Sequence, residues 1–168
     1  MSGVEKPNNI RDVLNKYLRP ITTRMAVATS GGIDSASIVM AAKDLDKKQI
    51  IVSFTFDDFE SHDFKSARLL AKHFNLDFLP VFLPSDQNKI VETVHYLIKE
   101  IKCKKKSAIE CMFPFVYLLK VLKENKIKTL VTGLAADGHF GLSKKAMIHY
   151  SKDDKKFKQL RQEYFSTY

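Results

Sequence analysis

Short apolar runs alternate with helix-like patterns along most of this chain. Runs rich in apolar and β-branched residues at 25–29, 50–56, 77–83 and 128–132 predict four β-strands. The run at 50–56 lacks a regular polar alternation, which is typical of a strand covered on both faces. Strands that alternate with helices predict parallel β-α-β units in a layered α/β sandwich.

Apolar residues at helical spacing fill the intervals between these strands. The predicted helices are a short one from Asn8 or Asn9 to Leu18, one from about Ser35 to Leu45, one after the acidic loop 57–63, one opened by Pro84 and Ser85 and running to about Ile101, and one from about Glu110 to Glu124. The residues expected to face the core are Ile38, Val39, Ala42, Leu45, Ala67, Leu70, Ala71, Phe74, Phe115, Leu118, Leu119 and Leu122. Because ligands of such folds bind beyond the carboxyl ends of the strands, the turns there are the first candidates for chemistry.

The turn after the first strand carries the strongest chemical signal. It reads Ser-Gly-Gly-Ile-Asp-Ser, and its two glycines, Gly31 and Gly32, suit a sharp turn and a close approach to a ligand. Backbone N–H groups at a helix N-terminus attract anions, and Ser30 and Ser35 add hydroxyl donors. Asp34 supplies an oxygen ligand of the kind that magnesium prefers. The motif indicates a site for nucleotide phosphates with a metal; the alternative is an ordinary turn built from small residues.

A second turn of this kind follows the fourth strand. The stretch from Thr132 to Gly141 contains several glycines, and Asp137 within it is a candidate second carboxylate for magnesium. The alternative is a solvent-facing turn with a helix-capping aspartate. If the first and fourth strands are neighbours, both turns open onto one crevice, where we expect ATP.

Composition narrows the setting of this site. The 168 residues suit one domain, no stretch is long and apolar enough to cross a membrane, and the N-terminus lacks the apolar segment of a signal peptide. Two cysteines, Cys103 and Cys111, have no metal-ligand spacing and fit a reducing compartment, so we expect a cytoplasmic protein without a membrane partner. The net charge of +9, concentrated in lysine-rich stretches at 99–106 and 144–161, suits triphosphates and keeps nucleic acid open as a minority alternative.

With these motifs in place, the chain resembles the synthetase domain of asparagine synthetase, within the PP-loop ATP pyrophosphatase superfamily. Three stretches carry the resemblance: the glycine motif, the segment Glu60–Asp63 with the helix after it, and the segment from Phe113 through Gly141. The resemblance covers roughly Met25 to Gly141. It implies an adenine-nucleotide α-hydrolase-like fold, a three-layer sandwich whose parallel sheet has the strand order 3-2-1-4. From the length and pattern of the chain we expect a single domain over 1–168, with a core at 20–142 and a basic helical tail at 143–168.

The resemblance also implies a set of site residues. ATP would be held by Ala28, Ser30, Gly31, Gly32, Asp34, Ser35, Phe54, Thr132 and Gly133, and magnesium by the two catalytic carboxylates Asp34 and Asp137. The family adenylates a carboxylate acceptor, releases pyrophosphate, and lets a nitrogen nucleophile form an amide.

The chain departs from the family pattern at several points. Leu134 and Gly138 replace glutamates of the second motif, the glutaminase domain is absent, and the chain stops soon after Gly141, so a truncated member is expected. The alternatives are a PP-loop enzyme that modifies tRNA or nucleotides, a non-catalytic ATP-binding module, and half of a split enzyme. Another chain, or a second copy of this one, would then supply the missing lobe.

Overall fold

The computed structural model of this protein describes residues 10–133. The chain divides into two compact units, Met1–Thr132 and Gly133–Tyr168, and the second is described only at Gly133. The single domain with a core at 20–142 and a helical tail at 143–168 therefore stays a prediction.

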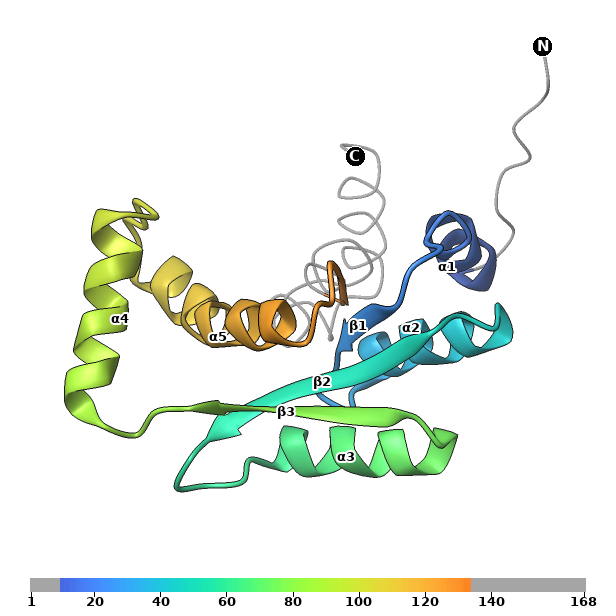
Figure 1. Ribbon diagram of the computed structural model, residues 1–168, viewed down its shortest axis with the longest axis horizontal. Coiled ribbons are helices and arrows are strands. Elements are labelled where there is room, and N and C mark those ends of the chain that lie inside the picture. Colours follow the sequence, from blue (N-terminus) through green and yellow to red (C-terminus); the bar gives the residue numbers. More distant parts are fainter. Residues whose placement is uncertain (1–9, 134–168) are drawn as a thin grey trace, which may run out of the picture. The chain divides into compact units, whose positions relative to one another are not determined.

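Four parallel strands form one sheet (Figure 1). They are β1 (Met25–Ala28), β2 (Gln49–Phe56), β3 (Asp77–Leu83) and β4 (Thr129–Thr132). Their order is β3-β2-β1-β4, which confirms the predicted α/β fold and its strand order. In the register of the sheet, Ala28 at the end of β1 lies opposite Val52 of β2 and Thr132 of β4.

The helices of the described residues are α1 (Ile10–Leu18), α2 (Ile33–Asp44), α3 (His62–Phe74), α4 (Gln87–Lys99) and α5 (Lys106–Glu124). Helix α4 begins after an Asp86 cap, two residues later than the predicted opening at Ser85. Helix α5 begins four residues before the predicted start, because the end of the lysine-rich stretch is itself helical and lysine has a good helix propensity. None of the described helices is long and apolar enough to cross a membrane.

Two apolar clusters fix the layers on either side of the sheet. Helices α1, α2 and α3 pack on one face, around Met25, Val27, Ile51, Val39 and Ala67. Helix α5 packs on the other face through Leu118 and Leu122, against Ala26, Val52 and Val81 of the strands. The first five residues of β2 are buried, as predicted for a strand with both faces covered. The three-layer sandwich is thereby confirmed.

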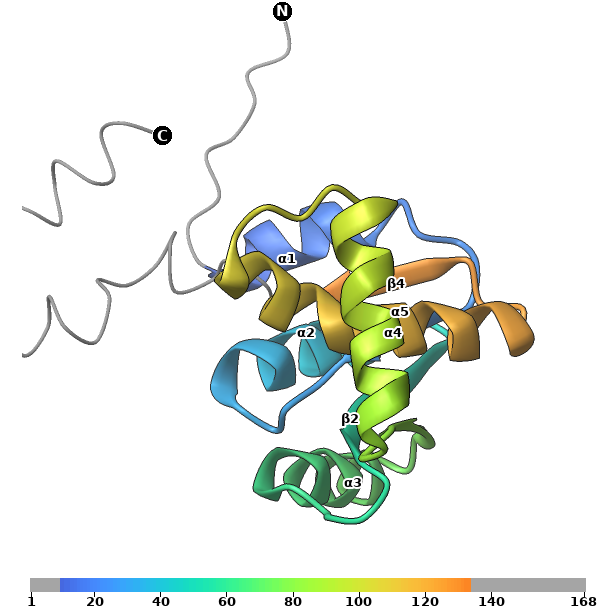
Figure 2. The same cartoon turned by 90° about the vertical axis from the view of Figure 1, so that its left-hand side faces the viewer.

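Helix α4 lies on the α5 side of the sheet and crosses α5 (Figures 1 and 2). A hydrogen bond of 2.6 Å joins the hydroxyls of Thr93 on α4 and Tyr117 on α5. The carboxyl end of β2 is consequently flanked by α4 and α5 on one side and by α3 on the other.

One residue predicted to face the core does not. Leu119 is 52% exposed, whereas Leu118 and Leu122 on the same helix are buried. The reason is geometric: Leu119 lies about 100° around α5 from Leu118, so it stands beside the buried face of the helix and not within it. The other predicted core positions are buried or half-buried.

Candidate functional site

The turn between β1 and α2 brings the glycine motif to the carboxyl end of the sheet. The Thr29 N–H still donates to the Val52 carbonyl at 2.9 Å, so the chain leaves the sheet only after Thr29. Gly31 then adopts a φ of +79°, a conformation that favours glycine. A Cβ at Gly31 would also lie 2.5 Å from the Cβ of Ser66 on α3. Gly31 is therefore required by the packing of the turn against α3 as well as by the turn itself.

Gly32 is the N-cap residue of α2 and carries no side chain to cap it. Its backbone is extended (φ −72°, ψ 164°), and no capping hydrogen bond from a side chain is present. The first N–H groups of a helix have no intrahelical partner, and the positive end of the helix dipole lies there too. The start of α2 is thus available to an anion.

The two serines of the motif have different roles in the structure. Ser30 is exposed, and its Oγ accepts a hydrogen bond from the Gly32 N–H at 3.2 Å, which leaves its own proton free for a ligand. Ser35 is buried, and its hydroxyl donates to the Gly32 carbonyl at 3.1 Å. Ser30 therefore suits direct contact with a phosphate, while Ser35 holds the turn in shape.

Asp34 stands in the first turn of α2 and is exposed. Asp34 directly follows Ile33, whose backbone N–H has no partner within the helix. An anion bound at that N–H and a cation bound by Asp34 would therefore be neighbours. No group of three or more His, Cys, Asp and Glu side chains that could hold a metal ion occurs in the described part of the chain. The single carboxylate of Asp34 fits Mg²⁺, which takes one or two carboxylates and otherwise uses waters and substrate phosphates.

The strand pairing brings Thr132, the first residue of the second motif, to the end of the sheet where the first motif begins. Because Ala28 lies opposite Thr132, the carboxyl ends of β1 and β4 are adjacent, as the two-turn crevice requires. Thr132 and Gly133 are half-buried at that end. Asp137, with the departures Leu134 and Gly138, lies outside the described residues.

Phe54 lies in the part of β2 that extends beyond the last residue of β1. It follows Val52 by two residues, so it stands on the same sheet face as Ala28, and it is 38% exposed. An exposed aromatic ring beside the end of β1 offers an apolar surface to a flat heterocycle. The predicted adenine contacts, Ala28 and Phe54, are thus compatible with one ring position.

The sequence of this chain matches a family profile described as asparagine synthase over residues 22–166. The chain belongs to the asparagine synthase family. No curated protein matches the sequence.

Two solved structures are similar to this asparagine synthase family member. The NH3-dependent NAD synthetase from Campylobacter jejuni subsp. jejuni NCTC 11168 has 14% identity and a TM-score of 0.48, over 73% of this chain and 51% of that one. The predicted subunit of tRNA methyltransferase from Methanocaldococcus jannaschii DSM has 21% identity and a TM-score of 0.47, over 77% of this chain and 63% of that one. The chain thus spans about half of the NAD synthetase chain and somewhat less than two thirds of the other.

The loop between β2 and α3, on the other side of Gly31, is held by its own hydrogen bonds. The Thr55 hydroxyl donates to the Phe59 carbonyl at 2.5 Å and accepts from the Ser61 N–H at 2.9 Å. Ser61 in turn caps α3 by accepting from the Phe64 N–H at 3.2 Å. Hydrogen bonding from Ser85 lowers the pKa of Asp57 below its ordinary value, outweighing the opposite effect of burial. The loop is thus held by hydrogen bonds within the chain.

Sequence reasoning passed over two residues at this site. Ser66 is the close neighbour that excludes a side chain at Gly31, and no local pattern identifies it because it lies on another helix. Ile33 is 82% exposed at the start of α2. The signal available in the sequence was an apolar residue between Gly32 and Asp34 of the candidate motif.

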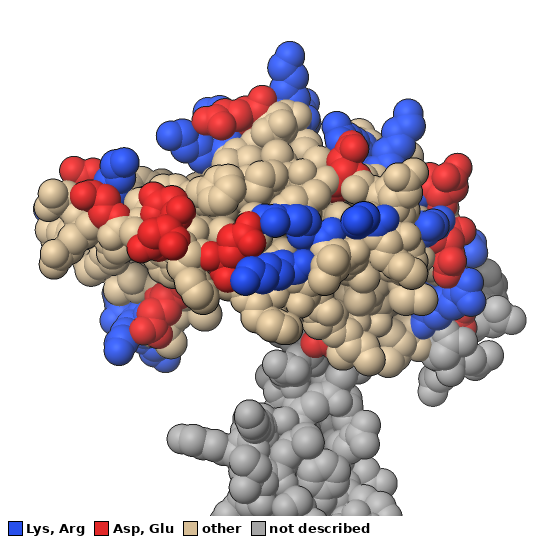
Figure 3. Space-filling model, turned by 90° about the horizontal axis from the view of Figure 1, so that it is seen from below, with Lys and Arg blue, Asp and Glu red and all other residues tan. Residues whose placement is uncertain are grey.

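The charge of the surface is mixed on the side that carries α3. In Figure 3, which shows this side from below, Lys and Arg side chains lie among Asp and Glu side chains. Among the described residues, ion pairs join Arg11 to Asp44, Arg24 to Asp77, and Arg68 to Glu60.

Proposed function

We propose that this chain binds Mg·ATP at the turn between β1 and α2 and cleaves it to AMP and pyrophosphate while adenylating an acceptor. The observation that carries the proposal is the uncapped start of α2 beside Ser30 and Asp34, at the carboxyl end of the adjacent strands β1 and β4. Membership of the asparagine synthase family supports an ATP-using ligase.

Each group of the turn has a part in holding the triphosphate. The free N–H groups at the start of α2 and the Ser30 hydroxyl would donate to the phosphates that leave as pyrophosphate. Asp34 would hold Mg²⁺, with Asp137 as the second proposed carboxylate. Bound Mg²⁺ neutralises charge on the phosphates and so favours departure of pyrophosphate.

The acceptor we propose is a carboxylate. One of its oxygens bonds to the α-phosphorus of ATP, the bond from that phosphorus to the bridging oxygen breaks, and pyrophosphate leaves with the electron pair. A nitrogen nucleophile then attacks the acyl carbon, forms the amide and releases AMP. The adenylation step depends on alignment and charge stabilisation, which backbone amides and a metal ligand supply.

The amide-forming step is less well supported by this chain. Leu134 and Gly138 stand where the family pattern has glutamates, and neither side chain accepts a proton. A base for the nitrogen nucleophile must then come from elsewhere, including the acceptor or a partner chain. Adenylation without amide formation by this chain alone is accordingly part of the proposal.

Product analysis tests the reaction. The purified chain is incubated with Mg·ATP and a panel of small carboxylates, and the nucleotide products are separated by ion-exchange chromatography. We expect AMP and pyrophosphate in equal amounts with the right acceptor. Release of ADP and phosphate would contradict the proposed cleavage.

The first prediction concerns Asp34. Asp34→Ala lowers affinity for Mg·ATP by at least about tenfold, because the magnesium loses a protein ligand. Asp63→Ala is the matched control: Asp63 holds the same position in the first turn of α3, so both changes remove an acid from the start of a helix. Isothermal titration with Mg·ATP separates them, and equal affinities in the two variants would remove Asp34 from the site.

Two alternatives keep a specific observation in their favour. Lys104, Lys105 and Lys106 lie exposed at the start of α5, which favours a PP-loop enzyme that acts on RNA; steep weakening of tRNA binding with salt would support it. Leu134 and Gly138 favour a non-catalytic ATP-binding module, which would bind ATP without turnover for every acceptor.

A cytoplasmic location remains part of the proposal, consistent with the free cysteines Cys103 and Cys111.

A further inference from the structure

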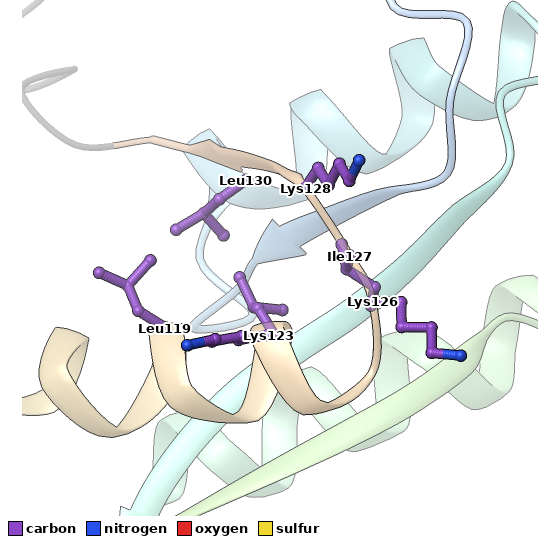
Figure 4. A pocket seen from close by; sticks show the side chains of 7 residues that line it. Leu119, Lys123, Lys126, Ile127, Lys128 and Leu130 are labelled. Carbon is purple, nitrogen blue, oxygen red and sulfur yellow. The ribbon is translucent and has the colours of Figure 1, made fainter.

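A pocket lies between the end of α5 and the start of β4, away from the nucleotide site (Figure 4). Its volume is about 360 Å³, and its lining residues are Leu119, Leu122, Lys123, Lys126, Ile127, Lys128 and Leu130. We call it the α5–β4 pocket. Figure 4 shows Leu119 of α5 and Leu130 of β4 on opposite sides of it, with Lys126 and Lys128 extending outward. The interior is apolar, the rim is cationic, and none of the described lining residues is acidic.

Leu119 makes this pocket unusual. It belongs to the apolar pattern of α5 and yet is 52% exposed. Leu119 continues the apolar lining formed by Ile127 and Leu130 out to the surface, and contiguous exposed apolar surface is typical of sites that bind apolar groups. Because three lysines stand at the rim, a partner that fills the pocket with an apolar group should also carry negative charge.

A surface of that chemistry exists elsewhere on the same chain. The turn at 56–60, here named the Phe59 turn, carries Phe59 with 66% of its side chain exposed. Asp57 and Asp58 lie beside it and are exposed. The turn is rigid, because the Thr55 hydroxyl and the Phe56 carbonyl both bond to the backbone of Phe59. Because the backbone that carries Phe59 is already held in place, binding through this turn costs less entropy than binding through a free loop.

One copy cannot bring these two surfaces together. The Phe59 turn follows the carboxyl end of β2, whereas Ile127 and Lys128 precede the amino end of β4. All strands are parallel, so these are opposite ends of the sheet. The pocket can therefore receive the turn only from another molecule.

We propose that a second copy of this chain inserts its Phe59 turn into the α5–β4 pocket. Phe59 would pack against Leu119 and Leu130, and Asp57 and Asp58 would face the rim lysines. Each copy has one turn and one pocket, so the contact is head-to-tail and forms rings or open chains. Burial of one aromatic side chain removes about 150–250 Å² from water, so this small contact alone gives weak association that depends on concentration and salt.

The test measures mass in solution. Sedimentation equilibrium of the full chain, up to roughly 0.1 mM, is expected to give a mass above that of the 19.2 kDa monomer, falling as salt is added. Phe59→Ser and Leu119→Asp each weaken the association by about tenfold or more. Leu69→Asp is the matched control, since Leu69 is 67% exposed on α3 and lies in neither surface.

Mixing the two variants gives the decisive result. The Phe59→Ser copy keeps its pocket and the Leu119→Asp copy keeps its turn, so their mixture should form 1:1 dimers although each alone is monomeric. If Leu119→Asp fails to fold, Lys126→Glu replaces it at an exposed position, with Asp58→Lys as the variant expected to restore its pairing. A monomeric wild-type chain, a mixture that stays monomeric, or assembly unaffected by both variants would overturn the proposal.

Discussion

Helices α2 and α3 begin in nearly the same backbone conformation but with opposite chemistry. Each follows a parallel strand, and the N-cap residues Gly32 (φ −72°, ψ 164°) and Ser61 (φ −65°, ψ 157°) are both extended. Ser61 caps α3 through its own side chain, whereas Gly32 leaves α2 without such a cap. The chain therefore satisfies one helix start with its own side chain and leaves the other without a side-chain cap, as the proposed phosphate site requires.

The loops before these helices show the same difference. Thr55 connects Phe59 and Ser61 by hydrogen bonds, so the loop before α3 is complete by itself. In the turn before α2, Ser30 accepts from Gly32 but keeps its own proton unused. A glycine N-cap costs a few tenths of a kcal/mol relative to serine, and under the proposed function a bound phosphate would offset that loss at α2.

The largest effect is expected at Gly31. Gly31→Ala places a methyl group 2.5 Å from Ser66 Cβ in a turn with a φ of +79°. Strain and overpacking together should lower the free energy of unfolding by at least about 2 kcal/mol, as measured by urea denaturation. Gly32→Ala is the control, because Gly32 has a negative φ and its nearest neighbour is the Ser30 side-chain oxygen at 3.2 Å. Equal losses in both variants would contradict a packing role specific to Gly31.

The cap of α3 is expected to matter for stability alone. Ser61→Ala removes the acceptor for the Phe64 N–H and should lower the free energy of unfolding by about 1 kcal/mol. Affinity for Mg·ATP should remain within about twofold, because the α3 start is closed to the ligand. Urea denaturation and titration calorimetry on one preparation check both statements. A large loss of ATP affinity would mean that both helix starts belong to the nucleotide site.

A smaller change converts the open helix start into a closed one. Gly32→Ser gives α2 the cap that α3 has and should stabilise the protein by a few tenths of a kcal/mol. The same hydroxyl accepts an N–H that a phosphate would use, so Mg·ATP should bind more weakly. Stability and affinity should thus change in opposite directions, and a parallel change would show that the start of α2 binds no phosphate.

The comparison also explains what the sequence could predict. The strand order, the range of β3 and the position of the motif at the start of α2 follow from local patterns and from the resemblance, and the structure bears them out. The proximity of Gly31 to Ser66 could not be read from either segment, because two elements distant in sequence create it. Leu119 misled for another reason: helical periodicity identifies an apolar face but not how much of that face the packing buries.

Acid should affect the closed loop before α3 through Asp57, in the smallest of these effects. Hydrogen bonding from Ser85, whose N–H donates to Asp57 Oδ1 at 2.9 Å, holds the pKa of Asp57 below its ordinary value of 3.8 in the folded protein. A group with a lowered folded pKa stabilises the protein above its unfolded pKa and loses that effect as pH falls through the folded value. The contribution should therefore be complete at neutral pH and disappear as the pH falls below about 4.

Asp57→Asn isolates that contribution, because the amide oxygen still accepts a hydrogen bond but cannot titrate. The urea midpoint of the variant should lie slightly below that of the wild-type chain at pH 7, and the two should converge as the pH is lowered towards 3. Asp58→Asn, in the same turn, is the control and should show no such convergence. A gap between Asp57→Asn and wild type that stays constant with pH would mean that the Ser85 hydrogen bonds favour the neutral side chain as much as the carboxylate. The loop before α3 would then owe its order to Thr55 and Ser61 alone.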